Sequence, residues 1–473
     1  MFENDWTKKI ILMTLIKSIS GIRGTIGGKV NEGLTPLDAV RFASAYGTWL
    51  IARNGGYKTK VVIGRDARIS GKMISDLVCS SLIGLGIDVV NLGLSTTPTV
   101  EIAVPLEHAQ GGIILTASHN PKQWNALKLL NEKGEFISGD DGAEVLSIAE
   151  AESFSYAEVD DLGVITNDDS YLKKHIDAIL DLPIVNQEAI KAADFSVVVD
   201  AVNSTGGIFV PAMLEALGVN KIEKLYCEPT GRFPHNPEPL PEHLTDLSTK
   251  IKELGSDIGI TVDPDVDRLA LVCEDGSMFG EEYTLVAVAD YVLSKTPGST
   301  VSNLSSTRAL RDVTEAIGEK YHAAAVGEVN VVNKMKAENA VIGGEGNGGV
   351  IYPELHYGRD SLVGIALFLS LLAEKKMSVS QLRDSYPAYT ISKNKIQLTP
   401  EIDVDAVLRT MATKYADQEV DTTDGVKIYI DKEWVHLRKS NTEPIIRIYS
   451  ESKSVESANK LAERIITEIK ETL

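Results

Sequence analysis

The chain has 473 residues, of which 43% are hydrophobic and 24% are charged, and its formal net charge at pH 7 is −20. These fractions are ordinary for a globular protein, and at about 150 residues per domain the length predicts three or four domains. Nucleic acids and anionic membrane surfaces are bound by basic faces, so this charge argues against both as partners. No run approaches the ~20 apolar residues of a membrane-spanning helix, so none is expected.

The cysteines indicate a reducing compartment. They are few, far apart and form no Cys-x-x-Cys pair, which predicts buried thiols and a cytoplasmic protein. They are Cys79, Cys227 and Cys273. Near the N-terminus, the apolar run 10–16 lacks the cleavage site of a signal peptide, and residues 1–12 are interpreted as an extension before Met13.

Strand-like and helix-like segments alternate through most of the chain, which predicts α/β layers built on largely parallel sheets. Three units of this kind follow one another and resemble weak internal repeats. The expected strand, helix and strand are 61–64, 70–86 and 87–92 in the first unit, 195–200, 207–218 and 219–226 in the second, and 300–304, 308–317 and 323–326 in the third.

The C-terminal part of the chain has a different pattern. A hairpin with its turn at Lys432 and Glu433, a strand at 445–449 and an amphipathic helix over 455–472 predict an α+β unit. The expected fold is therefore three similar α/β domains with mixed, largely parallel sheets, followed by a smaller α+β domain. The expected domains are 13–160, 161–275, 276–390 and 391–473.

A serine in a polar turn is the first candidate for chemistry. The strand-like segment 112–115 runs into Thr-Ala-Ser-His-Asn-Pro at 116–121. Because Pro121 disfavours helical backbone at Asn120, Ser118 is expected in a turn that exposes its hydroxyl. A turn that satisfies only its own backbone is the plain alternative. A serine hydrolase is another, but no Gly-x-Ser-x-Gly elbow surrounds Ser118.

Three aspartates at alternate positions are the second candidate. Asp263, Asp265 and Asp267 lie between two apolar, strand-like segments. Carboxylates without histidine or cysteine suit Mg²⁺, and Arg268 beside them could hold a transferring phosphoryl group. An EF-hand is excluded because Arg268 occupies the loop position that requires glycine. A solvated acidic turn is the remaining alternative, which the apolar flanks disfavour.

Two further segments can bind polar ligands. Gly-Glu-Gly-Asn-Gly-Gly at 344–349 matches the dinucleotide pattern G-x-G-x-x-G, but the strand-like segment 350–353 follows where a helix is needed, so a nucleotide site is rejected. Arg-Lys-Ser-Asn-Thr-Glu-Pro at 438–444, together with Arg447, offers guanidinium, hydroxyl, amide and backbone N–H donors to an anion. An ordinary surface hairpin loop is the alternative for 438–444.

In this order, the four segments resemble those of the α-D-phosphohexomutase family, and the resemblance extends from about Ser18 to the C-terminus. It implies domains that carry, in turn, a phosphoserine, a metal ion, a sugar-binding loop and a phosphate-binding loop. Segments 20–24 and 64–68 are similar to the family's N-terminal active-site loop and to its supporting Arg-Asp-x-Arg segment. Gly349 departs from the histidine of many bacterial relatives, which leaves the general base open.

The resemblance also implies roles for individual residues. The implied catalytic residues are Ser118, His119, Arg23 and Lys128, and the implied Mg²⁺ ligands are Ser118, Asp263, Asp265 and Asp267. The implied sugar-binding residues are Glu345, Asn347 and Arg268, and the implied phosphate-binding residues are Arg438, Ser440, Asn441, Thr442 and Arg447. Considered without the resemblance, Lys128 would be a strand residue whose amine reaches solvent.

The implied reaction moves a phosphoryl group between O1 and O6 of a phosphorylated hexose, through phospho-Ser118 and a hexose 1,6-bisphosphate. Glucosamine phosphate is the predicted substrate, because the 344–349 loop is most similar to archaeal-type phosphoglucosamine mutases. Phosphomannomutase and phosphoglucomutase activities are the alternatives within the family. A Mg²⁺-dependent sugar-phosphate phosphatase and a non-catalytic sugar-phosphate sensor are alternatives from other classes, although a sensor would need neither Ser118 nor the aspartates.

Overall fold

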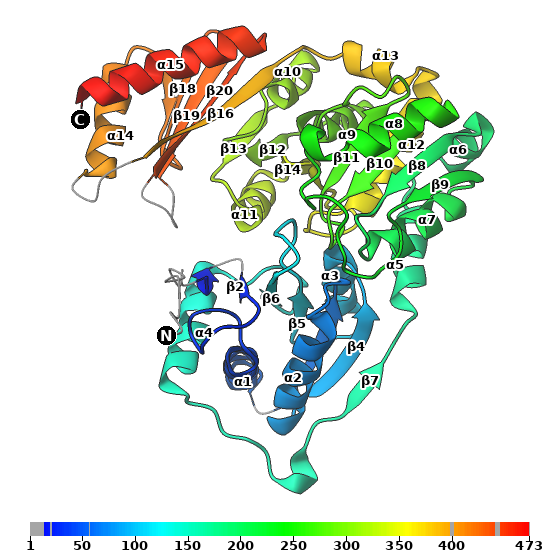
Figure 1. The fold of residues 1–473 in the computed structure, drawn as a ribbon, viewed down its shortest axis with the longest axis vertical. Coiled ribbons are helices and arrows are strands. Elements are labelled where there is room, and N and C mark those ends of the chain that lie inside the picture. The colour runs from blue at the N-terminus through cyan, green and yellow to red at the C-terminus, as the bar shows by residue number, and fades with distance from the viewer. Residues whose placement is uncertain (1–13, 19–20, 56, 398–401, 440–444, 473) are drawn as a thin grey trace, which may run out of the picture.

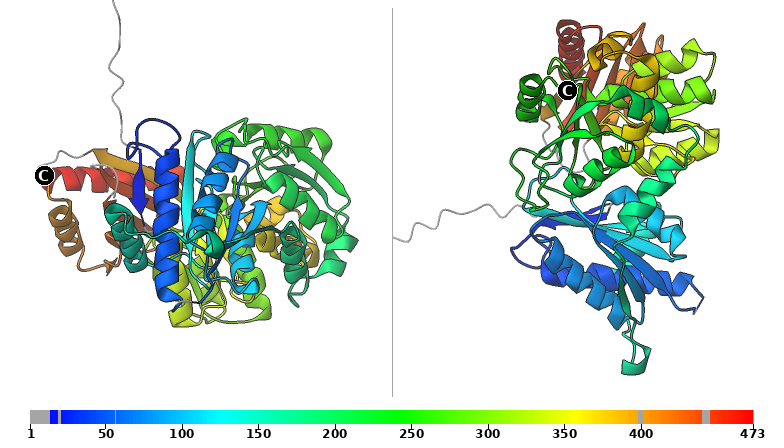
Figure 2. Two further views of the ribbon diagram at one scale, coloured as in Figure 1. Left: turned by 90° about the horizontal axis from the view of Figure 1, so that it is seen from below. Right: turned by 90° about the vertical axis from the view of Figure 1, so that its right-hand side faces the viewer.

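The computed structural model describes residues 14–18, 21–55, 57–397, 402–439 and 445–472. Four β-sheets organise these residues into four domains (Figure 1). The first domain, blue to cyan, lies below the other three, and Figure 2 shows the same arrangement from the side. None of the described helices is long and apolar enough to cross a membrane.

The first domain has a seven-stranded mixed sheet in the order β1-β2-β6-β5-β3-β4-β7. Its strands are β1 (Ile16–Ser18), β2 (Gly21–Thr25), β3 (Lys60–Arg65), β4 (Asp88–Leu94), β5 (Gly111–Leu115), β6 (Trp124–Leu130) and β7 (Ile165–Asn167). Its helices are α1 (Pro36–Arg53), α2 (Gly71–Gly84), α3 (Thr97–Leu106) and α4 (Gly139–Ala151). Alternate residues of β3 face different cores: Val61 packs with α1 and α2, whereas Val62 packs with α3. Both faces are therefore covered, as parallel strands require.

The second and third domains have four-stranded sheets in the orders β11-β10-β8-β9 and β13-β12-β14-β15. The second contains α5 (Tyr171–Leu180), α6 (Gln187–Ala193), β8 (Ser196–Asp200), α7 (Gly206–Ala216), β9 (Lys221–Leu225), α8 (Thr245–Leu254), β10 (Ile258–Val262) and β11 (Leu269–Cys273). The third contains α9 (Glu281–Lys295), β12 (Thr300–Asn303), α10 (Ala309–Ala316), β13 (Tyr321–Ala324), α11 (Glu328–Glu338), β14 (Ile342–Glu345), β15 (Gly349–Ile351), α12 (Ser361–Lys375) and α13 (Val379–Asp384). One hydrophobic core joins the two, since Val199 and Ile260 cluster with Val286 and Leu367.

The fourth domain is a five-stranded antiparallel sheet in the order β16-β20-β19-β18-β17, with α14 and α15 packed on one face (Figure 1). It contains β16 (Thr390–Gln397), α14 (Val404–Lys414), β17 (Glu419–Asp421), β18 (Val426–Ile430), β19 (Glu433–Lys439), β20 (Ile445–Ser452) and α15 (Val455–Thr472). The predicted turn at Lys432 and Glu433 is wrong by one residue, because Glu433 pairs with Ile430. Asp431 and Lys432 form the turn, and Asp431 has φ 56°, a conformation that aspartate tolerates.

The predicted fold class is confirmed: three domains have mixed sheets with parallel strands and the fourth is antiparallel. The expected strand–helix–strand units correspond to β3-α2-β4, β8-α7-β9 and β12-α10-β13. The last strand of the third unit, expected at 323–326, instead spans Tyr321–Ala324. The edge strand β7 lies beyond the expected boundary near 160 and pairs with β4 in the first sheet.

The internal repeat places three loops in equivalent positions. In each α/β domain, a parallel strand runs into a loop and returns as an antiparallel neighbour: β5 to β6, β10 to β11, and β14 to β15. The loops are the serine loop (116–121), the aspartate loop (263–268) and the sugar loop (346–348, with Glu345 at its start). Each follows the carboxyl end of a parallel strand, the edge at which α/β sheets bind ligands.

Candidate active site

The serine loop holds Ser118 in a strained turn directed at the aspartate loop. Ser118 has φ 47°, in the left-handed region that few non-glycine residues adopt. Its N–H is bonded to Thr116 Oγ1 at 2.9 Å, and Thr116 donates to Asp66 Oδ2 at 2.7 Å. Ser118 is 9% exposed, and its Oγ donates to Asp263 Oδ2 at 2.7 Å.

Arg68 fixes the shape of the serine loop. Its guanidinium is fully buried and donates to four backbone carbonyl oxygens, while its Nε pairs with Asp66 Oδ2 at 3.0 Å. The four acceptors are the carbonyls of Ser118 (2.5 Å), Asn120 (2.6 Å), Pro121 (2.8 Å) and Trp124 (3.0 Å). A planar cation with several fixed donors can hold a turn that its own residues would not favour.

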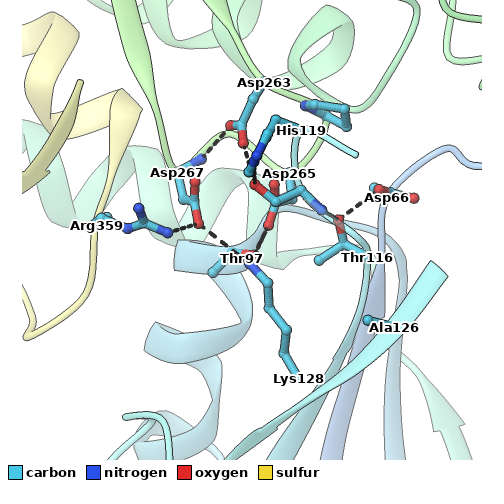
Figure 3. Close-up of polar contacts among 12 residues, drawn as sticks. Asp66, Thr97, Thr116, His119, Ala126, Lys128, Asp263, Asp265, Asp267 and Arg359 are labelled. Carbon is cyan, nitrogen blue, oxygen red and sulfur yellow. Dashed lines mark hydrogen bonds and ion pairs between the residues drawn. The ribbon is translucent and has the colours of Figure 1, made fainter. Parts of the chain in front are cut away.

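The aspartate loop gathers three buried carboxylates between β10 and β11 (Figure 3). One oxygen from each of Asp263, Asp265 and Asp267 lies within 4.8 Å of the others. Asp263 Oδ1 accepts the N–H groups of Asp267 at 3.2 Å and Arg268 at 3.1 Å, which closes the turn. Val266 is left with φ 64°, a strained conformation for a β-branched residue.

The carboxylate cluster fits a divalent cation. Asp265 Oδ2 accepts from Thr97 at 2.6 Å and Lys128 at 2.7 Å, and Asp267 Oδ2 accepts from Arg359 at 2.7 Å. The other oxygen of each, Oδ1, is buried and has no hydrogen-bond donor among the described residues. Buried, unpaired carboxylate oxygens are costly, and Mg²⁺ prefers such ligands, so these residues could hold the ion.

The carboxylates differ in their ease of ionisation. Burial, then repulsion from Asp267 and Asp265, raises the pKa of Asp263 well above its usual range. Burial would also raise the pKa of Asp267, but Arg359 and Lys128 outweigh it and hold that pKa below its usual range. A bound cation would favour the ionised form of every carboxylate in the cluster.

Lys128 and Arg23 are two cations of the first sheet, and Lys128 contacts the cluster. Lys128, on β6, is 8% exposed, so its amine does not reach into solvent. Its Nζ lies 2.7 Å from Asp265 Oδ2 and 3.4 Å from Asp267 Oδ2, and these carboxylates raise its pKa despite burial. Arg23, on β2, pairs in register with Ala126 of β6, and its buried Nε has no partner among the described residues.

His119 belongs to the serine loop and Arg268 to the aspartate loop. His119 Nδ1 is 3.4 Å from Ser118 Oγ, and burial followed by the charge of Arg268 lowers the pKa of His119 to about 2. Arg268 Nε lies 4.0 Å from both Asp263 and Asp267, and Glu238 pairs with Arg268 at 3.6 Å. The imidazole is therefore neutral near pH 7.

Glu345 and Asn347 begin the sugar loop. Glu345 Oε1 accepts from Asn303 Nδ2 at 2.8 Å and from the N–H of Gly327 at 3.2 Å. Asn347 Oδ1 accepts the N–H of Gly349 at 3.2 Å. The next element is the strand β15 rather than a helix, which confirms that the glycine pattern is not a dinucleotide site.

The fourth domain presents a row of cations. Arg438 on β19 lies opposite Arg447 on β20, which in turn lies opposite Lys395 on β16. Like charges in register destabilise a sheet, and a bound anion would relieve the repulsion. Asp424 pairs with Arg438 Nε at 2.8 Å. The remaining predicted phosphate ligands, Ser440, Asn441 and Thr442, lie outside the described residues.

Sequence models of four phosphoglucomutase/phosphomannomutase domains match this chain in order. Alpha/beta/alpha domains I, II and III match residues 16–156, 173–276 and 280–389, and the C-terminal domain matches 395–468. The chain belongs to this family. No hydrogen bond or ion pair among the described residues joins its paired arginines, Arg438 and Arg447, to the other three loops.

Individual relatives match over almost their whole length. A phosphoglucomutase/phosphomannomutase of Thermococcus kodakarensis is 37% identical over 95% of this chain and 98% of its own. A probable phosphoglucosamine mutase of Methanopyrus kandleri is 33% identical over 94% and 96%. Among solved structures, a phosphoglucomutase/phosphomannomutase family protein of Burkholderia thailandensis has a TM-score of 0.81 at 26% identity, covering 97% of this chain and 98% of that one.

Arg359 is a residue of this site that sequence reasoning missed. Its guanidinium binds Asp267 at 2.7 Å (Figure 3). It also binds Glu345 Oε2 at 2.8 Å, so it lies between the aspartate and sugar loops. The one recognisable feature of the sequence near Arg359 is the next residue, Asp360. Asp360 caps α12 by accepting the N–H of Leu362 at 2.8 Å. A capping aspartate predicts where a helix starts, but it does not reveal a long-range partner of its neighbour.

Proposed function

We propose that this protein is a phosphohexomutase that moves a phosphoryl group between O1 and O6 of a hexose phosphate through phosphorylated Ser118. The observation that carries the proposal is the hydrogen bond from Ser118 Oγ to Asp263, inside a buried cluster of three aspartates. A hydroxyl in that position can accept a phosphoryl group, and a neighbouring cation would neutralise the charge of that group. The four domains of the mutase family, matched in order, support the same activity.

The residues divide the work as follows. Phospho-Ser118 donates its phosphoryl group to the free sugar hydroxyl and forms a hexose 1,6-bisphosphate. This intermediate reorients in the site, and its other phosphoryl group is then transferred to Ser118. Held by Asp263, Asp265 and Asp267, Mg²⁺ would neutralise the charge of the phosphoryl group in transfer. Such in-line transfer depends on positioning and charge stabilisation.

The surrounding side chains fit those needs. Lys128 donates to Asp265 and Asp267 and adds positive charge next to the aspartate cluster. Arg23 and Arg268 each carry a buried Nε without a hydrogen-bond partner among the described residues, so each has a donor for phosphoryl oxygens. The arginine pair of the fourth domain would hold the phosphate that is not being transferred.

Glucosamine phosphate is the proposed substrate. Several of the relatives carry the name phosphoglucosamine mutase, including the Methanopyrus kandleri protein. A second candidate is mannose or glucose phosphate, favoured by the name of the Thermococcus kodakarensis relative. We place the reaction in the cytoplasm, because all three cysteines are free thiols.

A coupled assay of the purified protein on the 6-phosphates of glucosamine, mannose and glucose tests this function. With Mg²⁺ and a hexose 1,6-bisphosphate activator, we expect conversion to the 1-phosphates, with the highest kcat/KM for glucosamine phosphate. Inorganic phosphate should not accumulate. Phosphate release at the rate of substrate loss would identify a phosphatase instead, and binding without turnover would identify a sensor.

Replacing Arg447 with alanine should weaken the binding of every substrate by a similar factor. Losing one charge-assisted contact costs about 1.5–3 kcal/mol, so KM should rise about 10- to 100-fold for all three sugars. Asn347→Ala should instead change the ratio of kcat/KM between sugars, because it alters a contact near the sugar. Arg409→Ala, an exposed arginine of the same domain, is the matched control. The roles assigned to Arg447 and Asn347 are wrong if Arg447→Ala alters sugar preference and Asn347→Ala does not.

A further inference from the structure

Arg359 connects the two loops that the proposed reaction uses. It is 8% exposed, and three carboxylates surround its guanidinium: Nη2 lies 2.7 Å from Asp267, Nη1 2.8 Å from Glu345 and Nε 3.0 Å from Glu328. Glu328 also accepts the backbone N–H of Arg359 at 3.1 Å. Each of the three guanidinium nitrogens thus donates to a different carboxylate, which fixes both the position and the orientation of the planar group.

The stem of Arg359 explains why residue 349 is a glycine. A Cβ at Gly349 would lie 2.3 Å from Cδ and 3.0 Å from Cγ of Arg359, well inside van der Waals contact. Gly349 is not among the glycines with positive φ, so its backbone does not need the freedom of glycine. Moving the stem away from such a Cβ would shift the guanidinium relative to its three carboxylate partners. Gly349 is therefore required for the space that Arg359 occupies.

Backbone hydrogen bonds join the same segments. The N–H of Leu269, after the aspartate loop, donates to Gly348 O in the sugar loop at 3.0 Å. The N–H of Ser361, two residues beyond Arg359, donates to Val266 O in the aspartate loop at 3.2 Å. Aspartate loop, sugar loop and the start of α12 therefore form one connected unit, with the Arg359 side chain across its centre.

We propose that Arg359 is a positioning residue that holds the aspartate loop and the sugar loop in one arrangement, and that residue 349 is a glycine because a side chain there would collide with the Arg359 stem. By binding Asp267 Oδ2 and Glu345 Oε2, Arg359 leaves Asp267 Oδ1 for a cation and fixes where Glu345 meets the sugar. This rests on the proposed function insofar as the loops bind Mg²⁺ and a hexose phosphate.

Gly349→Ala is the principal test, because it displaces the guanidinium without removing any charge. Calorimetric titration with Mg²⁺ alone should show binding weakened about 10- to 100-fold, as when groups that orient metal ligands are lost. The ratio of kcat/KM between glucosamine and glucose phosphates should also change. Gly142→Ala, where an added Cβ meets nothing within 4 Å, is the matched control and should change neither.

A double-mutant cycle with Arg359→Ala separates positioning from general loosening. Once the stem is gone, Gly349→Ala should have no further effect on Mg²⁺ binding; an equal effect in both backgrounds overturns the proposal. Arg359→Ala removes the cation that three buried carboxylates share, so Arg359→Lys is the second variant. Lysine keeps an aliphatic stem and the charge but lacks the planar set of donors, and it should still weaken Mg²⁺ binding. The proposal is also overturned if a variant melts at a lower temperature but keeps the wild-type Mg²⁺ affinity and the wild-type ratio of kcat/KM between the sugars.

Failure of this inference and failure of the proposed function are distinguishable. The Mg²⁺ titration does not require turnover, so weakened binding in Gly349→Ala supports positioning even if the wild-type protein converts none of the three sugars. If the wild type is an active mutase and Gly349→Ala alters neither Mg²⁺ affinity nor sugar preference, the proposed function stands and the positioning role of Arg359 is rejected.

Discussion

Ser118→Ala should lose mutase activity by about 10⁴-fold or more, because it removes the group that carries the phosphoryl. The fold should persist: Arg68 holds the turn through backbone carbonyls, and alanine meets the same left-handed strain at φ 47° that serine does. Purified wild-type protein should carry phosphate on Ser118, located by peptide mass spectrometry, and the variant should carry none.

The matched control for this change is Ser170→Ala, an exposed serine whose Oγ donates to Asp168 at 2.6 Å. It should retain wild-type activity and leave the phosphopeptide unchanged. Activity near wild type in Ser118→Ala, or phosphate found on another residue instead, would reject Ser118 as the phosphoryl carrier. Circular dichroism and thermal unfolding of both variants would show that lost activity is not lost structure.

Removing the divalent cation should have the second largest effect. Chelation should reduce turnover by about 10³-fold, because the charge of the phosphoryl group in transfer would face three aspartates. Asp265→Asn should lower Mg²⁺ affinity and rate together. Its stability should change little, since the lost ion pair with Lys128 is offset by reduced repulsion between the carboxylates.

Asp177→Asn provides the control for the metal prediction, because Asp177 pairs with Lys173 on an exposed helix face. Its Mg²⁺ affinity, measured by calorimetry, should equal that of the wild type. Undiminished turnover by metal-stripped protein would show that the aspartate cluster serves another purpose. Restoration of activity by Mg²⁺ after chelation is the expected positive result.

Local pattern was enough to find the three strand–helix–strand units, the last helix and three of the loops. The helix over 455–472 was predicted with its bounds because amphipathic spacing extends through it. The aspartate loop could be recognised because its three carboxylates are neighbours in sequence and lie between apolar strands. The hairpin turn at Asp431 was misplaced by one residue, because the choice between adjacent turn positions depends on the strand register and not on composition.

The sequence by itself determined which residue types were available for phosphoryl transfer: a serine in a turn, adjacent carboxylates and clustered arginines. Only the tertiary structure decided how they meet. The bond from Ser118 to Asp263, the inward direction of Lys128, and the three carboxylates around Arg359 all join residues far apart in the chain. No local periodicity records such contacts, because they arise when the equivalent loops of three domains converge. For the same reason, the sequence shows Gly349 only as a departure from the histidine of many bacterial relatives, whereas in the fold its missing side chain leaves space for the Arg359 stem.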